Sequence, residues 1–343
     1  MQQFVQALKT RRLDGYITSN DTNITYLTEF PASESWLLVT PRQAFYITDF
    51  RYELEAKKGL KGVKVVRYSN SIFASLFEQA RACRVKRLGF DSRHVSLALF
   101  QQMKKHCPKG IELVEANPLL EELRAVKEKK EIALIRRALK LHHQALRYLK
   151  GVIRPGATEQ EVLLKLERFV KGRGAGFSFD PIIAAGANSC YPHARVTGRR
   201  IRNNEPVLVD FGIDIQGYKS DLTRIFFLGK IAPLVKKVYN EVSIAQDRAI
   251  RFIKAGIKAA DVDFQARNYL EEKNLAKFFG HSLGHGVGLD IHESPRISHN
   301  NPAVLKAGMV ITIEPAVYIP NKFGIRIEDM ILVTEHGYEI LSR

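Results

Sequence analysis

The chain contains 343 residues, of which 45% are hydrophobic and 26% are charged, the proportions of an ordinary globular protein. Its length favours two domains over a single hydrophobic core. No apolar run approaches the length of a transmembrane helix, and the amphipathic first residues lack the apolar core of a signal peptide, so no membrane association is expected. Three scattered cysteines without disulfide or metal spacing favour the reducing cytoplasm.

The formal net charge of +17 raises the question of nucleic-acid binding. Lysine and arginine outnumber aspartate and glutamate by 18 to 11 in residues 1–117 and by 35 to 25 in the remainder. Because this excess is spread along the chain without a nucleic-acid-binding motif, we interpret it as a solvated basic surface and do not expect nucleic acid as a partner. Attraction of anionic substrates or partners is the alternative interpretation.

Residues 1–117 are predicted to form an α/β domain. Helical patterns cover residues 2–12 and 71–82. The strand-like segments lie at 35–39, 43–48, 62–66 and 87–91. This alternation is typical of a sheet with parallel strands. The domain has neither a phosphate-binding loop nor a dinucleotide fingerprint, so we do not expect it to carry the chemistry.

A second domain, residues 118–343, is predicted to begin at Pro118 and to open with a charged amphipathic helix at 127–150. Residues 152–162 have a counterpart at 252–262, and each copy places a glycine between the end of one helix and the start of another. The second helices are predicted at 159–171 and 260–273. A repeat of this kind predicts two similar α+β halves with a pseudo-twofold relation and a site between them.

Two aspartates interrupt an apolar strand pair in the second domain. A two-residue turn at Gln216-Gly217 would place Asp210 opposite Thr223, with Asp221 one diagonal step away on the same face. Carboxylates on an apolar face repel each other and lose hydration, so a shared cation is the natural counterion. A register slip of one residue would separate them onto opposite faces, so this prediction depends on the turn.

Further metal-ligating side chains follow in apolar surroundings. Residues 280–293 contain four glycines and three histidines, and glycine permits close approach of the backbone to a ligand. Glu314 lies in a strand of β-branched residues, and Arg326 and Glu328 share one face of a later strand. Glu314 and Glu328 are equidistant from Asn321, so an antiparallel pair would set them side by side. A salt bridge could explain one carboxylate, but it explains four in separate strands poorly.

These donors comprise two aspartates, two glutamates and at least one histidine. Such a set suits Mn²⁺, Co²⁺, Fe²⁺ or Zn²⁺ in a catalytic site better than structural zinc, which prefers thiolates. Five ligands exceed the need of one catalytic zinc but fit two ions about 3.5–4 Å apart with bridging carboxylates. Such a pair activates water and polarises a carbonyl, which is suited to hydrolysis.

The ordered motifs around these donors resemble the dinuclear metallopeptidases of the pita-bread fold, and more narrowly the proline-specific branch with aminopeptidase P and prolidase. The motifs are Val-Asp-Phe-Gly at 209–212, Ser-Asp-Leu-Thr-Arg at 220–224, Gly-His-Gly-Val-Gly-Leu at 284–289, Thr-Ile-Glu-Pro at 312–315 and Arg-Ile-Glu-Asp at 326–329. The segments 13–16 and 23–27 are similar to the family's creatinase-like N-terminal domain. The resemblance therefore implies an α/β creatinase-like domain followed by an α+β pita-bread catalytic domain.

The resemblance also implies a role for each matching metal ligand. Asp210 would bind one ion, while His285 and Glu314 would bind the other. Asp221 and Glu328 would bridge the two ions. Glu314 would serve in addition as the general base for the attacking water.

Other matching residues would contact the substrate or orient the site. His193, in Tyr-Pro-His-Ala, would lie near the substrate, and His292 would contact the scissile carbonyl or the oxyanion. Arg326 would orient the carboxylates and histidines. Arg296 occupies the position at which prolidase-like members hold the free carboxylate of the substrate, with an ordinary surface residue as the alternative. Ala316 replaces the glycine that usually follows Glu-Pro.

We therefore expect a metal-dependent exopeptidase that cleaves the bond before proline, in dipeptides or in longer peptides, with two divalent ions of which Mn²⁺ is favoured. Proline-containing peptides are the expected substrates, and a homodimer is expected because such relatives usually dimerise. The alternative is a non-catalytic pita-bread protein that binds peptide, protein or nucleic acid. Retention of all five ligands disfavours this alternative, as it does a metal-free creatinase-like enzyme, and methionine aminopeptidases usually lack the front domain.

Overall fold

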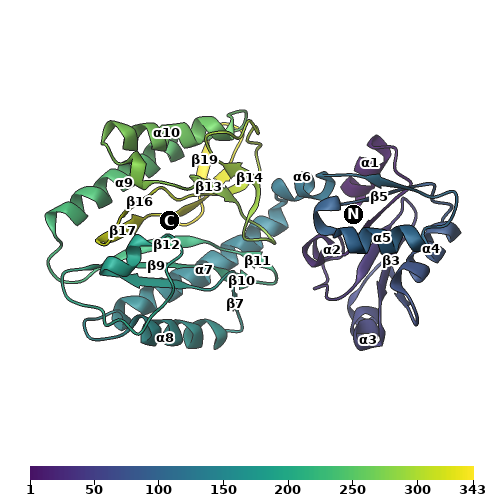
Figure 1. Ribbon diagram of the computed structural model, residues 1–343, viewed down its shortest axis with the longest axis horizontal. Coiled ribbons are helices and arrows are strands. Elements are labelled where there is room, and N and C mark those ends of the chain that lie inside the picture. Colours follow the sequence, from purple (N-terminus) through teal and green to yellow (C-terminus); the bar gives the residue numbers. More distant parts are fainter. The chain divides into compact units, whose positions relative to one another are not determined.

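A six-stranded mixed sheet with the order β4-β3-β2-β1-β5-β6 is the centre of the N-terminal unit, Met1–Arg124. The computed structural model describes residues 1–343, and the chain separates into this unit and a C-terminal unit, Ala125–Arg343 (Figure 1). The strands are β1 (Gly15–Thr18), β2 (Trp36–Val39), β3 (Ala44–Thr48), β4 (Val63–Arg67), β5 (Arg87–Phe90) and β6 (Glu112–Glu115). The pairs β1–β5, β5–β6 and β3–β4 are parallel, so the predicted parallel content is confirmed.

Helices cover both faces of this sheet. They are α1 (Gln2–Thr10), α2 (Asp21–Thr28), α3 (Phe50–Gly59), α4 (Ile72–Ala82), α5 (Leu97–His106) and α6 (Leu119–Ala125). Adjacent strand residues enter opposite apolar clusters, with Tyr16 and Leu37 in one and Ile17 and Leu38 in the other. A sheet buried on both faces requires continuous apolar strands, which β1 to β3 provide.

The N-terminal elements predicted from the sequence are present within two residues of their expected bounds. The helices α2, α3, α5 and α6 were not predicted; in α3 only Ala56 is buried, so its apolar periodicity is weak. The unit also extends beyond the predicted boundary at residue 117. Leu119 and Leu120 of α6 belong to the same apolar cluster as Phe4, so α6 packs with the N-terminal unit.

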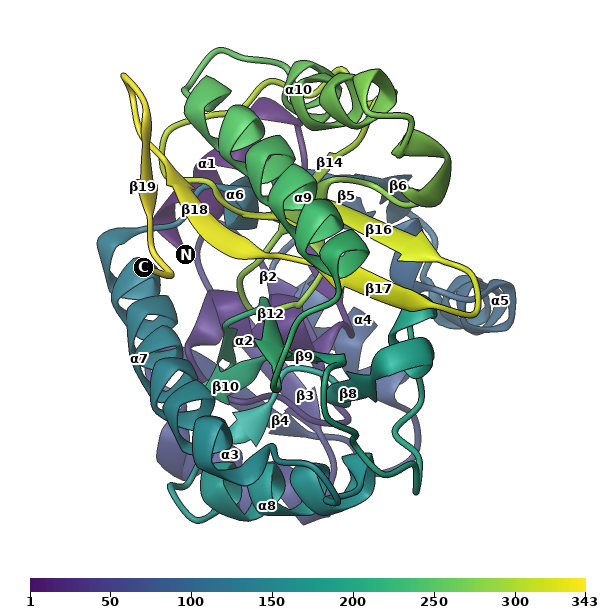
Figure 2. The same ribbon diagram turned by 90° about the vertical axis from the view of Figure 1, so that its left-hand side faces the viewer.

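Four long helices lie on the outside of the C-terminal unit, with strands between them (Figures 1 and 2). They are α7 (Lys129–Val152), α8 (Glu159–Lys171), α9 (Pro233–Phe252) and α10 (Ala259–Glu272), close to the predicted bounds. The apolar residues of α7 and α8 form one cluster mainly with the strands before residue 223, which Val310 and Met330 also join. Those of α9 and α10 form another cluster mainly with the strands after residue 309. The strands are therefore enclosed by a helix pair from each half of the repeat.

The strands of this unit form four small sheets, with the orders β12-β9-β8, β11-β10-β7, β14-β13-β15-β18-β19 and β16-β17. Those of the first half are β7 (Gly176–Phe177), β8 (Ile182–Ala185), β9 (Pro206–Phe211), β10 (Ile213–Ile215), β11 (Tyr218–Lys219) and β12 (Leu222–Phe227). Those of the second half are β13 (Gly284–Gly286), β14 (Glu293–Ile297), β15 (Val310–Ile313), β16 (Ala316–Ile319), β17 (Phe323–Arg326), β18 (Asp329–Val333) and β19 (Tyr338–Ile340). Short 3₁₀ helices add η1 (Ser92–His94), η2 (Gly186–Cys190) and η3 (Ala276–Phe278).

The internal repeat predicted from the sequence has the same backbone geometry in both copies. Gly156 and Gly256 have φ angles of 88° and 89°, in the left-handed region that favours glycine. The amide of Gly156 donates to the carbonyl of Ile201, and that of Gly256 donates to the carbonyl of Leu305, each at 2.9 Å. Identical turns with matched long-range bonds support two halves of common design.

No helix is both long and apolar enough to cross a membrane.

Candidate metal centre

Asp210 lies on β9 and Asp221 directly precedes β12, the strand paired with β9, in the register that the sequence predicts. Asp210 of β9 is opposite Thr223 of β12. The turn has φ angles of 55° at Gln216 and 85° at Gly217, the positive pair that a tight two-residue hairpin requires. The long hairpin departs from a simple ladder, because its tip, β10 and β11, belongs to a different sheet from its base, β9 and β12.

The two glutamates face each other across an interruption between two ladders. Ile313 pairs with Asp329 in the β15–β18 ladder, and Ala316 pairs with Arg326 in the β16–β17 ladder. Glu314 and Glu328 lie between these pairs at matching positions. The side-by-side placement predicted from their equal spacing is therefore confirmed.

These strands bring the candidate ligands into one cluster. Asp221, His285 and Glu328 are buried, and their ligand atoms all lie within 4.8 Å of one another. The Nε2 atom of His285 is 3.6 Å from Asp221 Oδ2 and 3.4 Å from Glu314 Oε1. One carboxylate oxygen of Asp210 and one of Asp221 are buried without a hydrogen-bond donor. A buried oxygen without a donor is unfavourable, so a cation among these groups would improve its environment.

Burial and mutual repulsion change the protonation of the cluster. Loss of hydration, followed by the neighbouring carboxylates, raises the pKa of Asp221 and of Glu314 well above their usual values and raises the pKa of Glu328 to about 8. Burial also lowers the pKa of His285 to about 4, which keeps its imidazole neutral at pH 7. A neutral imidazole among acidic groups is in the form that binds a metal.

Arg326 connects the acids to the surrounding backbone. Its guanidinium donates to Asp210, to Thr223 Oγ1 at 3.0 Å and to the carbonyl of Pro192 at 3.1 Å. Thr223 Oγ1 in turn donates to Glu328 at 2.8 Å. These contacts place Arg326 beside the acids, and its orienting role stays a prediction.

Three residues predicted to contact the substrate lie beside this cluster. The rings of His292 and His285 are 4.3 Å apart. Burial lowers the pKa of His292, and the nearby positive charges of His193 and Arg296 lower it further. His193 and Arg296 are exposed, so both are accessible to a substrate.

Comparison with known proteins agrees with this geometry. Residues 133–335 match the profile of Metallopeptidase family M24, and residues 1–126 match that of the Creatinase/Prolidase N-terminal domain. The chain belongs to metallopeptidase family M24. Its pita-bread catalytic domain follows a creatinase-type N-terminal domain, as the sequence resemblance implies.

Individual members of the family are similar over their whole length. An Xaa-Pro dipeptidase of Pyrococcus horikoshii is 32% identical over 100% of this chain and 96% of its own. The structure of an Xaa-Pro dipeptidase from Bacillus anthracis is 34% identical, with a TM-score of 0.94 over 100% of this chain and 96% of that chain. The X-Pro aminopeptidase of Thermotoga maritima is 31% identical, with a TM-score of 0.91 over 98% and 97%.

Metallopeptidases of family M24 use divalent metal ions, and the buried cluster suits such ions. It offers hard carboxylate oxygens, one neutral imidazole and two oxygens that lack donors inside the protein. Several carboxylates buried together destabilise the fold by their mutual repulsion, and a bound dication would remove that repulsion. The cluster is therefore the candidate metal centre of this metallopeptidase.

Two contributors to the site were not singled out from the sequence. Tyr318 is buried, and its hydroxyl accepts a hydrogen bond from Arg326 and lies 3.3 Å from His281 Nε2. Burial lowers the pKa of His281 to about 4. His281 lies within the glycine-rich and histidine-rich segment that the sequence highlights, whereas Tyr318 has no local signal beyond its place in an apolar strand.

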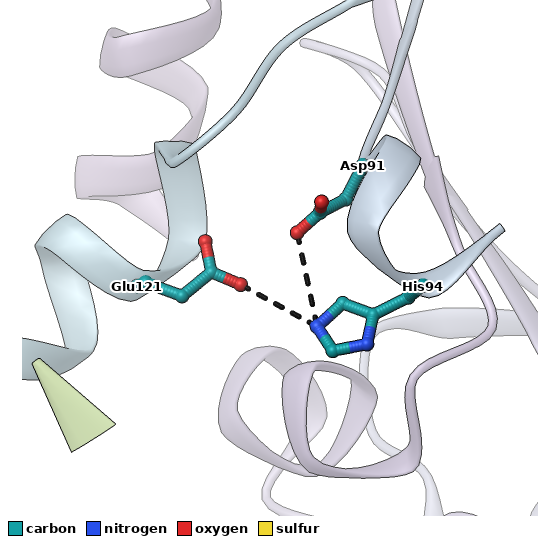
Figure 3. A group of neighbouring side chains, drawn as sticks. All are labelled: Asp91, His94 and Glu121. Atoms are coloured by element: carbon teal, nitrogen blue, oxygen red, sulfur yellow. Dashed lines mark ion pairs between the residues drawn. The ribbon is translucent and has the colours of Figure 1, made fainter.

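The N-terminal unit contains a second group of possible ligands, Asp91, His94 and Glu121 (Figure 3). His94 Nε2 is 3.9 Å from Asp91 and 3.8 Å from Glu121. The guanidinium of Arg93 lies closer to both acids, at 2.8 Å and 2.6 Å. Because Arg93 already supplies the positive charge, we interpret this group as an ion-pair network and assign no metal to it.

Proposed function

We propose that this metallopeptidase is an exopeptidase that hydrolyses the peptide bond before proline. The observation that carries the proposal is the group of four acids and one histidine, with two buried carboxylate oxygens lacking donors, beside exposed His193 and Arg296. The proline preference is supported by the similar proteins, which include both Xaa-Pro dipeptidases and an X-Pro aminopeptidase. The imide nitrogen of such a bond carries no N–H, so a dedicated site is required.

Two divalent ions are proposed as the cofactor, with Mn²⁺ as the native metal. Asp210 would hold one ion, His285 and Glu314 the other, and Asp221 and Glu328 both. When bound, the ions supply a water molecule of lowered pKa and polarise the substrate carbonyl. The oxygen-rich donor set supports Mn²⁺ over a thiolate-seeking metal.

The protein's own groups would complete the reaction. Glu314 accepts the proton of the attacking water, and His292 donates a hydrogen bond to the oxygen of the scissile carbonyl as negative charge develops there. His193, exposed on the loop after η2, would contact the substrate. Arg326 holds the Asp210 carboxylate toward the cluster, and Thr223 restrains Glu328.

We assign the selection of substrate length to Arg296. Its exposed guanidinium neighbours His292 and could pair with a free carboxylate on the proline, which only a dipeptide carries at that position. We therefore favour Xaa-Pro dipeptides over longer peptides. A homodimer in the cytoplasm is proposed from the family resemblance, and the absence of disulfide spacing supports the location.

The test is hydrolysis of Xaa-Pro and Xaa-Pro-Yaa peptides after loading with Mn²⁺ or Co²⁺. Cleavage before proline is expected, with faster cleavage of the dipeptide. Metal analysis of the same preparation should find two ions per chain. A metal-loaded protein that cleaves neither substrate would contradict the proposed function.

A further inference from the structure

We propose that Glu159 is a positioning residue that holds the loop carrying His193 in place. This inference rests on the proposed function, because it assigns to Glu159 an effect on catalysis that acts through His193. The loop, residues 186–196, leaves the end of β8 and contains η2, and His193 is exposed near its far end. Glu159 is the first residue of α8, and none of its side chain is exposed.

The Glu159 carboxylate accepts hydrogen bonds from both ends of the loop. At the start, the Ala185 amide donates at 2.8 Å, and the Asn188 side-chain amide reaches both oxygens at 3.1 Å and 2.9 Å. At the end, the Thr197 amide donates at 3.0 Å and its hydroxyl at 2.6 Å. One buried carboxylate therefore closes the loop at its base.

The opposite side of the loop is attached to the candidate metal centre. Ser189 Oγ accepts from the amide of Gly324 in β17 at 2.8 Å, and a Cβ at Gly324 would lie 2.0 Å from the Ser189 carbonyl oxygen. Arg326 donates to the carbonyl of Pro192, the residue before His193. The position of His193 relative to the cluster thus depends on two anchors, Arg326 on the site side and Glu159 on the far side.

Glu159 is not required to cap its helix. Thr158 and Glu161 already form a reciprocal capping box, in which each side chain accepts from the other's amide. The Glu159 carboxylate is directed instead toward the loop. Its hydrogen bonds go to Ala185, Asn188 and Thr197 and to none of the five candidate metal ligands.

The second half of the repeat provides an internal comparison. Ala259 begins α10 as Glu159 begins α8, and both are buried. The Ala259 amide donates to the carbonyl of Ala303 at 2.8 Å, as the Glu159 amide does to that of Arg199 at 3.1 Å. The fold therefore forms the same helix start without a carboxylate, which indicates that the carboxylate of Glu159 serves the loop of His193 and not the helix start.

A double-mutant cycle tests this coupling. Glu159→Gln replaces one acceptor oxygen with an amide group that faces donors, and we expect at least a tenfold loss of kcat/KM on an Xaa-Pro dipeptide. Mn²⁺ affinity and stoichiometry should remain within twofold of the wild type. In a His193→Ala background the same change should cost less than twofold, because the residue it positions is gone. Losses that multiply in the double variant would overturn the proposal.

Two comparison variants separate positioning from general stability. Glu161→Gln, two residues along α8, makes the same carboxylate-to-amide change in the capping box, where glutamine can still accept, and should leave kcat/KM within twofold. Glu159→Asp retains the charge on a shorter side chain and should lose less kcat/KM than Glu159→Gln. Equal losses for Glu159→Gln and Glu161→Gln would overturn the proposal.

Trypsin cleavage gives a readout that needs no catalytic activity. Arg195 is exposed, and its carbonyl accepts from Asn188, one of the side chains that Glu159 holds. We expect Glu159→Gln to raise the rate of cleavage after Arg195 at least fivefold, measured by mass spectrometry, and Glu161→Gln to leave it unchanged. Unchanged cleavage in Glu159→Gln would overturn the loop anchor itself. A wild type inactive on proline peptides would instead refute the proposed function while this measurement still tests the anchor.

Discussion

Arg326 donates a hydrogen bond to Asp210, 116 positions earlier in the chain, and both side chains are buried. The bond joins the first half of the repeat, through β9, to the second half, through β17. Arg326 also donates to Pro192 and Thr223, so one guanidinium restrains the loop of His193 and the paired strands β9 and β12.

Removal of this guanidinium should destabilise the metal-free protein. Arg326→Met leaves Asp210 as a buried charge without its partner, and we expect a loss of about 3–5 kcal/mol in the free energy of unfolding. Saturating Mn²⁺ should recover part of this loss, because the cation would neutralise Asp210. Urea unfolding with and without Mn²⁺ measures both effects, and Lys165→Met, on the exposed face of α8, is the control. Equal losses of unfolding free energy in the two variants would contradict the role of Arg326 as the charge partner of Asp210.

Glu314 is expected to be essential for turnover. Glu314→Gln retains the shape of the side chain but cannot accept a proton, so kcat should fall by about 10²–10⁴-fold. Metal content must be measured in the same sample, because Glu314 also lies 3.4 Å from His285 and is a candidate ligand. Retained turnover in a metal-loaded variant would refute the role of Glu314 as general base.

Gln246 is expected to influence metal affinity without touching the metal. Its buried side-chain amide on α9 donates to the carbonyls of Ile313 and Ile327, at 3.0 Å and 3.1 Å, and these residues directly precede Glu314 and Glu328. Gln246→Leu removes both bonds, and the Mn²⁺ dissociation constant should rise about 10–100-fold.

Titration calorimetry of the apoprotein measures this constant. Val242→Ala, one turn earlier on α9 in the same apolar cluster, is the matched control, because it removes packing but no hydrogen bond. An equal change in metal affinity for the two variants would show that the effect is general destabilisation.

His142 should make the stability of the apoprotein depend on pH. It is buried, stacks on Phe211 and lies 3.1 Å from Ser220 Oγ, and burial lowers its pKa well below the usual value. Below about pH 6.5 the unfolded chain therefore binds a proton at His142 that the folded protein does not bind. The free energy of unfolding falls as the pH falls below this value.

Comparison of wild type with His142→Gln isolates this contribution from the acids of the cluster. Their raised pKa values act in the opposite direction, since they favour the folded state at lower pH. Between pH 5 and 6.5, the free energy of unfolding should rise with pH more steeply for the wild type than for the variant, by up to about 1.4 kcal/mol per pH unit. Urea unfolding in the presence of a chelator measures both slopes. Parallel pH profiles for the two proteins would contradict this account.

Arg296 should determine the response to substrate length. Arg296→Ala removes a charged partner for the free carboxylate of a dipeptide, so KM for Xaa-Pro should rise about 10–100-fold, while KM for Xaa-Pro-Yaa should change little. Steady-state kinetics on matched peptides measure the split. Equal changes for both substrates would assign Arg296 to general binding and not to length selection.

Local sequence patterns determined the parts of the site that depend on turns and periodicity. The Gln216-Gly217 turn sets the register that places Asp210 opposite Thr223, because a two-residue hairpin admits only one pairing. The equal spacing of Glu314 and Glu328 around Asn321 likewise predicts their opposition. The repeat of the glycine turns at 156 and 256 predicts two halves of one design.

Only the tertiary structure decided which groups hold these acids in position. Arg326, Gln246 and Glu159 each bond to partners more than twenty residues away, and no local period encodes such a contact. The hydrogen bonds of these buried groups form when the helices and strands of the two halves pack together, because burial is what makes an unpaired polar group unfavourable. The sequence by itself therefore determined the candidate ligands and their register, and the packing of the two halves decided how rigidly those ligands are held.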